Sequence, residues 1–196
     1  LRCESAMKLS EQKESIKTAI LGCIEREFPE EDVAVMLSGG ADSITLALAA
    51  HHLGKKIVAY TYRIVGYSNP DYQTARSVCD KMGWRFVGVD ITLDDLPERF
   101  LDLFYDFECT LKTEAEVLFP MWAVIDHIVG DGFRKVLTGF GSPIPTSAQK
   151  GKKCDDNPEK FWSEMAIRVA MGEEESPATT KVINYAKERK LHLVKA

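Results

Sequence analysis

The chain has 196 residues, of which 45% are hydrophobic and 28% are charged, and its formal net charge is −5. This length and composition predict one folded domain with a sizeable core and exclude a natively disordered protein. The negative charge and the lack of an extended Lys/Arg tract argue against broad nucleic-acid binding.

Cysteine usage and hydropathy indicate the cellular compartment of the protein. Five cysteines are scattered along the chain without a C-x-x-C pair, a pattern that predicts neither a disulfide framework nor a four-cysteine zinc site. No apolar run approaches the roughly 18 residues of a membrane span, and no charged-then-apolar leader opens the chain. We therefore expect a cytoplasmic protein without a membrane contact, with a frayed lead at residues 1–9 and one domain over residues 10–196.

Hydrophobic periodicity predicts strands and helices that alternate along most of the chain. Short apolar runs predict strands at 33–37, 57–62, 84–90 and 135–139. Three- and four-residue spacing predicts helices at 10–28, 43–53, 71–82, 94–107, 113–129, 159–171 and 179–189. We expect Ser10 to cap the first helix, Pro120 to bend or interrupt its helix, and residues 140–158 to form a long loop. The 94–107 helix is predicted to carry Leu96, Phe100, Leu103 and Phe104 on one face.

This alternation predicts an α/β fold, an open and mostly parallel sheet with helices on both faces and helices at the C-terminal end. Sheets of this kind bind ligands beyond the carboxyl ends of their strands, where the strand order reverses. The predicted edge collects Ser38–Ser43, Thr61–Arg63, Asp90 and Gly139–Ser142.

The stretch Ser38-Gly39-Gly40-Ala41-Asp42-Ser43 joins the first strand of this sheet to a helix. Glycines, hydroxyls, exposed amides and a helix N-terminus together favour an anion. Asp42 would repel a phosphate unless a cation such as magnesium lies between them. The local chemistry therefore predicts a polyphosphate with its metal, although no Walker string G-x-x-x-x-G-K-[ST] occurs in the chain.

The same stretch resembles the S-G-G-x-D-S pyrophosphate loop of the N-type ATP pyrophosphatases, or PP-loop enzymes. Over about residues 10–190 the chain further resembles the synthetase domain of the asparagine synthetase family, which includes the β-lactam synthetases. Leu37–Ser43 is similar to the first motif of that family, and Val136–Ser142 to its second motif, V-L-T/S-G-x-G-A/S. Asp71, Ala75 and Arg76 in the 71–82 helix, and Phe119-Pro120, also match.

The resemblance implies an ATP-binding, AMP-forming carbon–nitrogen ligase that uses ATP and Mg²⁺. It activates a small-molecule carboxylate as an acyl-adenylate, which an amine or ammonia then captures. Asp42 and Ser43 would be the catalytic residues, with Asp42 as the metal ligand, and Thr61 and Gly139 would flank the adenosine. The implied nucleotide-binding residues are Leu37, Ser38, Gly39, Gly40, Asp42, Ser43, Thr61, Tyr62, Gly139, Phe140 and Gly141.

Three departures from the family pattern bear on this interpretation. The N-terminal glutaminase domain is not in the sequence, so nitrogen is expected from ammonia, a substrate amine or a separate amidotransferase subunit. Pro143 stands where the second motif continues into an acidic residue. Phe140 stands where asparagine synthetases have Glu and β-lactam synthetases have Tyr, and a phenyl ring neither transfers a proton nor binds a metal.

Two alternatives stay open at this point. Another PP-loop ATP pyrophosphatase could modify RNA or a small heterocycle, although the chain shows neither paired cysteines nor a basic face. A catalytically degenerate nucleotide-binding protein would explain Phe140 and Pro143 beside an intact first motif.

Overall fold

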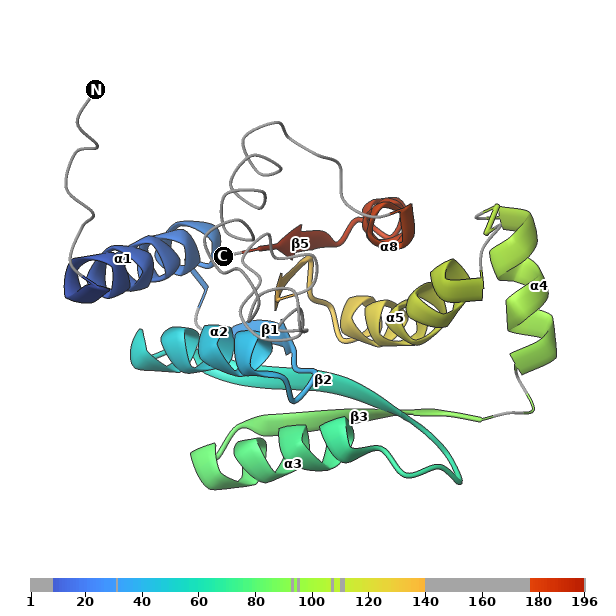
Figure 1. The fold of residues 1–196 in the computed structure, drawn as a ribbon, viewed down its shortest axis with the longest axis horizontal. Helices are drawn as coiled ribbons and strands as arrows, with labels where there is room; N and C mark the ends of the chain where they lie inside the picture. Colours follow the sequence, from blue (N-terminus) through green and yellow to red (C-terminus); the bar gives the residue numbers. More distant parts are fainter. Residues whose placement is uncertain are drawn as a thin grey trace, which may run out of the picture.

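The computed structural model describes residues 9–30, 32–92, 94, 96–106, 108–109, 112–139 and 177–195 (Figure 1). In these residues helices and strands alternate over most of the chain. The elements are α1 (Leu9–Glu27), β1 (Asp32–Met36), α2 (Ala41–His52), β2 (Lys56–Ile64), α3 (Pro70–Met82), β3 (Arg85–Ile91), α4 (Leu96–Asp106), α5 (Lys112–Gly130), β4 (Lys135–Thr138), α8 (Pro177–Glu188) and β5 (His192–Val194).

The five strands form one parallel sheet in the order β3-β2-β1-β4-β5. Val35 in β1 is in register with Ala59 in β2 and with Leu137 in β4, so β1 is the central strand. From β1 the chain first adds strands on one side and then crosses to the other, which places the reversal of strand order between β1 and β4. The predicted open parallel sheet is confirmed.

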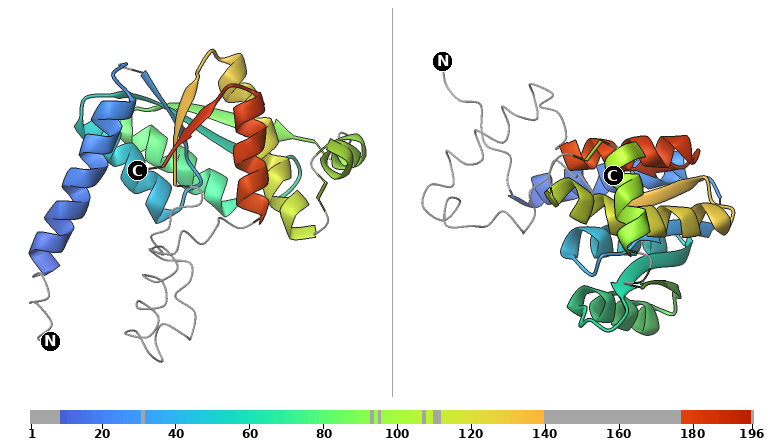
Figure 2. Two further views of the ribbon diagram at one scale, coloured as in Figure 1. Left: turned by 90° about the horizontal axis from the view of Figure 1, so that it is seen from above. Right: turned by 90° about the vertical axis from the view of Figure 1, so that its right-hand side faces the viewer.

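Two layers of helices cover the two faces of this sheet (Figure 2). Along β1, Val33 and Val35 point into the core that α1, α2 and α3 share with the sheet. The intervening Ala34 and Met36 point into the core under α4, α5 and α8. Because both faces are buried, β1 reads in the sequence as a continuous apolar run and not as an alternating one.

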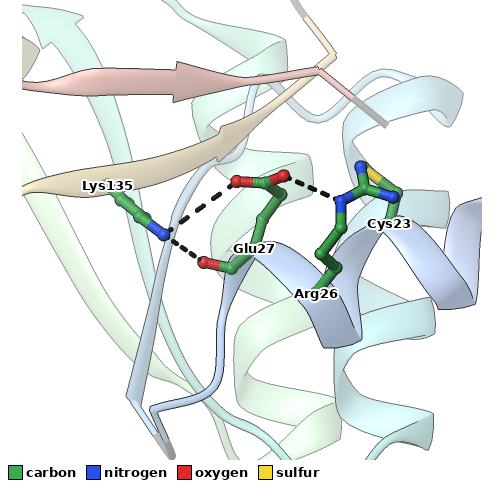
Figure 3. Close-up of polar contacts among 4 residues, drawn as sticks. All are labelled: Cys23, Arg26, Glu27 and Lys135. Atoms are coloured by element: carbon green, nitrogen blue, oxygen red, sulfur yellow. Dashed lines mark hydrogen bonds and ion pairs between the residues drawn. The ribbon is translucent and has the colours of Figure 1, made fainter.

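Two lysines tie the C-terminal end of α1 to the sheet. Lys135 Nζ, at the start of β4, donates a hydrogen bond of 2.7 Å to the carbonyl of Glu27, whose carboxylate also meets Arg26 (Figure 3). Lys55 Nζ donates to the carbonyls of Phe28 and Glu30 at 2.6 and 2.9 Å. The last carbonyls of a helix have no partner within the helix, so these ammonium groups satisfy them and fix the entry into β1.

Several expected element boundaries differ in the structure. Helix α1 starts at Leu9, so Ser10 lies inside the helix and not at its N-cap. Strand β2 continues to Ile64, beyond the predicted end at Tyr62, because β3 pairs with it as far as Ile91. Strand β5 was not expected; its three residues are too few to carry a periodic signal.

Two further expectations concern α4 and α5. Helix α5 runs through Pro120 as one element, so of the expected bend or interruption the interruption does not occur, and the bend stays a prediction. On α4, Leu103 is buried, whereas Phe104 is 45% exposed, with its ring 6.3 Å from that of Phe100. The lead over residues 1–8, the loop 140–158 and the predicted helix 159–171 lie outside the described residues. No helix of the described part of the chain is long and apolar enough to cross a membrane.

Helix α3 packs closely on the sheet at Gly88 of β3, and a substitution there can test this contact. A Cβ there would approach Tyr72 of α3, within 2.9 Å of Cε2 and Cζ. The Tyr72 ring is held between Phe86, with centroids 5.2 Å apart, and the Arg63 guanidinium. We expect Gly88→Ala to lower the free energy of unfolding by about 1–3 kcal/mol, as overpacking does, in urea denaturation.

Gly22 provides the control for this substitution. It lies in α1, and nothing is within 4 Å of its would-be Cβ, so Gly22→Ala should stabilise the protein by about 0.5–1 kcal/mol through helix propensity. Equal stability of Gly88→Ala and wild type would show that Tyr72 does not constrain α3.

Candidate functional site

A cavity of about 350 Å³ lies at the carboxyl ends of β1, β2 and β4, next to the reversal of strand order. Four segments that are far apart in the sequence contribute to it: the end of β1 with the start of α2, the end of β2, the middle of α5 and the end of β4. The lining residues are Met36, Leu37, Ser38, Gly40, Ala41, Asp42, Ser43, Tyr60, Thr61, Tyr62, Met121, Val124, Thr138 and Gly139.

Two hydroxyl groups hold the loop between β1 and α2 in a closed shape. Ser43 Oγ donates a hydrogen bond to the Gly40 carbonyl at 3.1 Å and accepts one from the Ser38 amide at 3.2 Å. Ser38 Oγ lies 3.1 Å from Ser43 Oγ and accepts from the Gly40 amide at 3.4 Å. Ser43 is buried, so its hydroxyl serves as an internal strut of the loop.

The N-terminus of α2 has no side-chain cap. Its N-cap residue is Gly40, which has no side chain to accept a hydrogen bond from the first turn. The free amides of a helix N-terminus carry partial positive charge and bind anions. The first turn of α2 therefore presents an anion-binding end to the cavity, with Asp42 beside it.

Two glycines allow three chain segments to meet at this loop. Gly39 has φ +79°, and a Cβ there would lie 2.5 Å from the carbonyl oxygen of Asp71 in the first turn of α3. A Cβ on Gly139, just after β4, would lie 3.2 Å from both Asp42 Cβ and Ser43 N. The loop is thus packed against α3 on one side and against the end of β4 on the other.

The wall of the cavity opposite the loop is largely apolar and aromatic. Its members come from β1, β2 and α5: Met36, Tyr60, Tyr62, Met121 and Val124. Tyr60 Oη donates a hydrogen bond of 2.6 Å to Asp131, and burial together with this bond raises the Tyr60 pKa. Burial also raises the Tyr62 pKa, and the charge of Asp71 adds to the effect. Both phenols are therefore neutral at neutral pH.

A single carboxylate at the anion-binding end fits a magnesium ion that is bound together with phosphates. In the described ranges, no group of three or more His, Cys, Asp or Glu side chains could hold a metal ion. Magnesium bound with a nucleotide takes one or two protein carboxylates and completes its shell with phosphate oxygens and water. Asp42, which lines the cavity at the start of α2, can supply one such oxygen.

The structure brings together most of the residues that the sequence nominates. Leu37, Ser38, Gly40, Asp42, Ser43, Thr61, Tyr62 and Gly139 line one cavity, and Gly39 lies within its loop. Phe140, Gly141 and Pro143 lie outside the described residues. Asp90 and Arg63 do not line the cavity; they pair at 2.7 and 2.9 Å, and Arg63 holds the Asp90 pKa below its usual value.

Five lining residues were not predicted: Met36, Tyr60, Thr138, Met121 and Val124. Tyr60 and Thr138 immediately precede nominated residues, so strand position offers a signal for them. Met121 and Val124 lie in an apolar helix, and nothing in their local sequence separates them from ordinary core residues. Their role depends on how α5 crosses the sheet.

Comparisons with known proteins agree with this geometry. The family model described as asparagine synthase matches residues 24–143, which is more than half of the chain and includes the loop and the end of β4. The chain is 30% identical over 127 residues to asparagine synthetase [glutamine-hydrolyzing] 2 of Arabidopsis thaliana. It is 28% identical over 138 residues to the protein of the same name from Oryza sativa subsp. japonica.

These curated relatives are much longer than the chain. The Arabidopsis alignment covers 61% of this chain and 22% of the relative, and the rice alignment covers 66% and 23%. Among solved structures, the NH3-dependent NAD synthetase from Campylobacter jejuni subsp. jejuni has a TM-score of 0.50 at 13% identity, over 93% of this chain and 95% of that one. This likeness concerns the fold alone. The family match establishes that the chain belongs to the asparagine synthase family, within the PP-loop ATP pyrophosphatase superfamily.

Proposed function

We propose that the chain, as one synthetase domain over residues 10–196, catalyses ATP-dependent amide-bond formation through an acyl-adenylate. The observation that carries the proposal is the Ser38–Ser43 loop, which places an uncapped helix N-terminus and a carboxylate at one end of a cavity with an aromatic wall. A polyphosphate fits the end of the cavity at the Ser38–Ser43 loop, and a purine fits the aromatic wall. The family match supports an ATP-using synthetase.

The loop would bind the pyrophosphate portion of ATP. The other backbone amides of the loop and of the first turn of α2 would be the donors, because the Gly40 amide and the Ser38 and Ser43 hydroxyls already hydrogen-bond within the loop. Asp42 would hold Mg²⁺, which when bound neutralises phosphate charge. Because the hydroxyls already brace the loop against itself, few groups need to reorganise when the anion binds.

The apolar wall would hold the adenine base. Tyr62, Met121 and Val124 offer flat and flexible apolar surface, and Thr61 of β2 and Gly139 after β4 would flank the ribose. This orientation places the α-phosphate between the base and the loop, near the carboxyl ends of β1 and β4.

The reaction would proceed in two displacements. An oxygen of the substrate carboxylate attacks the α-phosphorus, the bond from that phosphorus to the bridging oxygen breaks, and pyrophosphate leaves. The nitrogen of an amine or ammonia then attacks the acyl carbon, AMP leaves with the bonding electrons, and the nitrogen loses a proton. Positioning and charge neutralisation supply most of the acceleration in such transfers. The curated relatives are glutamine-hydrolyzing by name, and for this chain a separate amidotransferase subunit would supply the ammonia.

A second candidate is a nucleotide-binding protein without turnover. It is favoured by Phe140 and Pro143, which replace the polar residues that the second family motif carries. The two candidates share the nucleotide site and differ in whether the α-phosphate reacts.

Exchange of labelled pyrophosphate into ATP tests the proposal directly. With Mg²⁺ and a panel of carboxylates, we expect exchange that requires one carboxylate and is absent without it. Calorimetric titration with ATP in parallel reports binding alone. ATP binding without exchange on any carboxylate would contradict the ligase and favour the second candidate, and no ATP binding would contradict both.

A further inference from the structure

Helix α4 presents an apolar ridge to solvent. Leu101, Phe104 and Tyr105 are 57%, 45% and 81% exposed. Their spacing of three and four residues places them on one side of the helix, where neighbouring side chains touch. The exposed Pro97 lies on the same side, one turn earlier. Neighbouring exposed apolar side chains of this kind are a feature of surfaces that bind another molecule.

The side of α4 that holds Phe100 and Leu103 is already buried against the body of the protein, and Phe104 lies at its border, with its ring 6.3 Å from Phe100. Leu103 is fully buried, and the Phe100 ring lies 5.4 Å from Phe119 of α5. The Arg99 guanidinium lies over the Trp122 ring at 5.0 Å. The helix therefore cannot rotate to bury its ridge without giving up these contacts. The ridge is a second apolar face, in addition to the one that α4 uses for folding.

An acidic row borders the ridge. Glu98 and Asp102 are exposed, one helical turn apart, and adjoin Leu101 and Tyr105 on the helix surface. Within the part of the chain that the structure describes, neither carboxylate takes part in an ion pair. The one cation of α4, Arg99, is held inward over Trp122. The surface thus combines apolar side chains with unneutralised negative charge.

We propose that the outward face of α4 is a docking surface for another protein, which binds through a segment that pairs an apolar stripe with lysine or arginine side chains. Apolar burial would supply affinity, and the acidic row would select the partner and its orientation. A second copy of this chain is a poor occupant, because two α4 helices would bring the same acidic rows together.

The docking surface is separate from the candidate nucleotide site. Helix α4 lies at the periphery of the molecule (Figures 1 and 2) and contributes no residue to the cavity lining. A partner that binds α4 therefore contacts a helix that does not line the cavity. The inference therefore does not depend on the proposed ligase reaction, and the two can fail independently.

The test uses a helical peptide built only from leucine and lysine at amphipathic spacing, with a leucine–glutamate peptide of the same pattern as its counterpart. Fluorescence anisotropy should show that the full chain binds the leucine–lysine peptide more tightly than the leucine–glutamate peptide. Measured at two salt concentrations, binding of the leucine–lysine peptide should be weaker at the higher one. Leu101→Ser with Phe104→Ser should weaken binding about tenfold or more. Glu98→Lys with Asp102→Lys should reverse the preference between the two peptides.

A matched control substitutes other exposed apolar residues. Ile16 and Leu48 are 50% and 41% exposed on α1 and α2, so Ile16→Ser with Leu48→Ser removes similar apolar surface elsewhere. We expect this variant to bind the lysine peptide as wild type does, and all variants to bind ATP as wild type does. Equal losses in both serine variants would overturn the proposal, as would absence of peptide binding. A wild-type dimer that the α4 substitutions dissociate would show that a second copy occupies the surface instead.

Discussion

Gly39→Ala is expected to abolish ATP binding while the protein still unfolds cooperatively. The native φ of +79° costs an alanine about 1–2 kcal/mol. The larger effect comes from the new Cβ, which would lie 2.5 Å from the Asp71 carbonyl oxygen. That oxygen belongs to the first turn of α3, so it cannot rotate away as a side chain does. Either the loop or α3 must shift. The hydrogen-bond donors around Ser38 and Gly40 would then no longer converge on one anion.

Calorimetric titration with ATP and Mg²⁺ measures this loss, and urea unfolding shows whether the fold persists. Gly54→Ala is the matched control. Gly54 has φ +75° in the turn between α2 and β2, but nothing lies within 4 Å of its would-be Cβ. This variant should pay a similar backbone cost and keep ATP binding. If Gly39→Ala bound ATP with wild-type affinity, the contact between the loop and α3 would not determine the site.

Asp42→Asn is expected to remove magnesium-dependent pyrophosphate exchange. The substitution keeps the size of the side chain and removes its charge, at the start of α2 and beside the Ser43 strut. A metal held by Asp42 loses an anionic protein ligand, and we expect the exchange rate to fall by about 10²-fold or more. Raising the magnesium concentration should restore part of the activity if the lost group is a metal ligand.

Asp90→Asn serves as the control for this second prediction. Asp90 is also a carboxylate at the carboxyl edge of the sheet, but it pairs with Arg63 and does not line the cavity. Its substitution should leave both exchange and the dependence on magnesium unchanged. An Asp42→Asn protein with the wild-type magnesium dependence would show that Asp42 does not hold the metal.

The site could be located from the sequence to a large extent because its central part is local. The strand, loop and helix from Val33 to Ala50 are consecutive, and each residue type there has a direct physical reading: apolar for the strand, glycine for the turn, hydroxyls for the strut. The ends of β2 and β4 followed from the rule that parallel sheets bind ligands at the carboxyl edge. Thr61, Tyr62 and Gly139 were expected at that edge for this reason, and all three line the cavity.

The remaining features depend on contacts between distant segments. Asn69 caps α3 by accepting a hydrogen bond from the Tyr72 amide at 3.0 Å, a local signal that the prediction of a helix starting at Asp71 missed. For Met121 and Val124, by contrast, the local sequence holds no signal. Spacing places Phe104 on the same face of α4 as Phe100, and its ring lies 6.3 Å from Phe100, but the local sequence does not show that the packing of α4 leaves Phe104 45% exposed.

By itself, the sequence determined the parallel α/β fold, the family and the anion-binding loop, since these follow from periodicity and from residues adjacent in the chain. The tertiary structure decided what that loop faces: Asp71 against Gly39, Asp42 and Ser43 against Gly139, and an aromatic wall from β2 and α5. It also decided which side of α4 remains exposed. Such features depend on the packing of segments that are distant in sequence. Local sequence patterns do not predict which segments pack against each other.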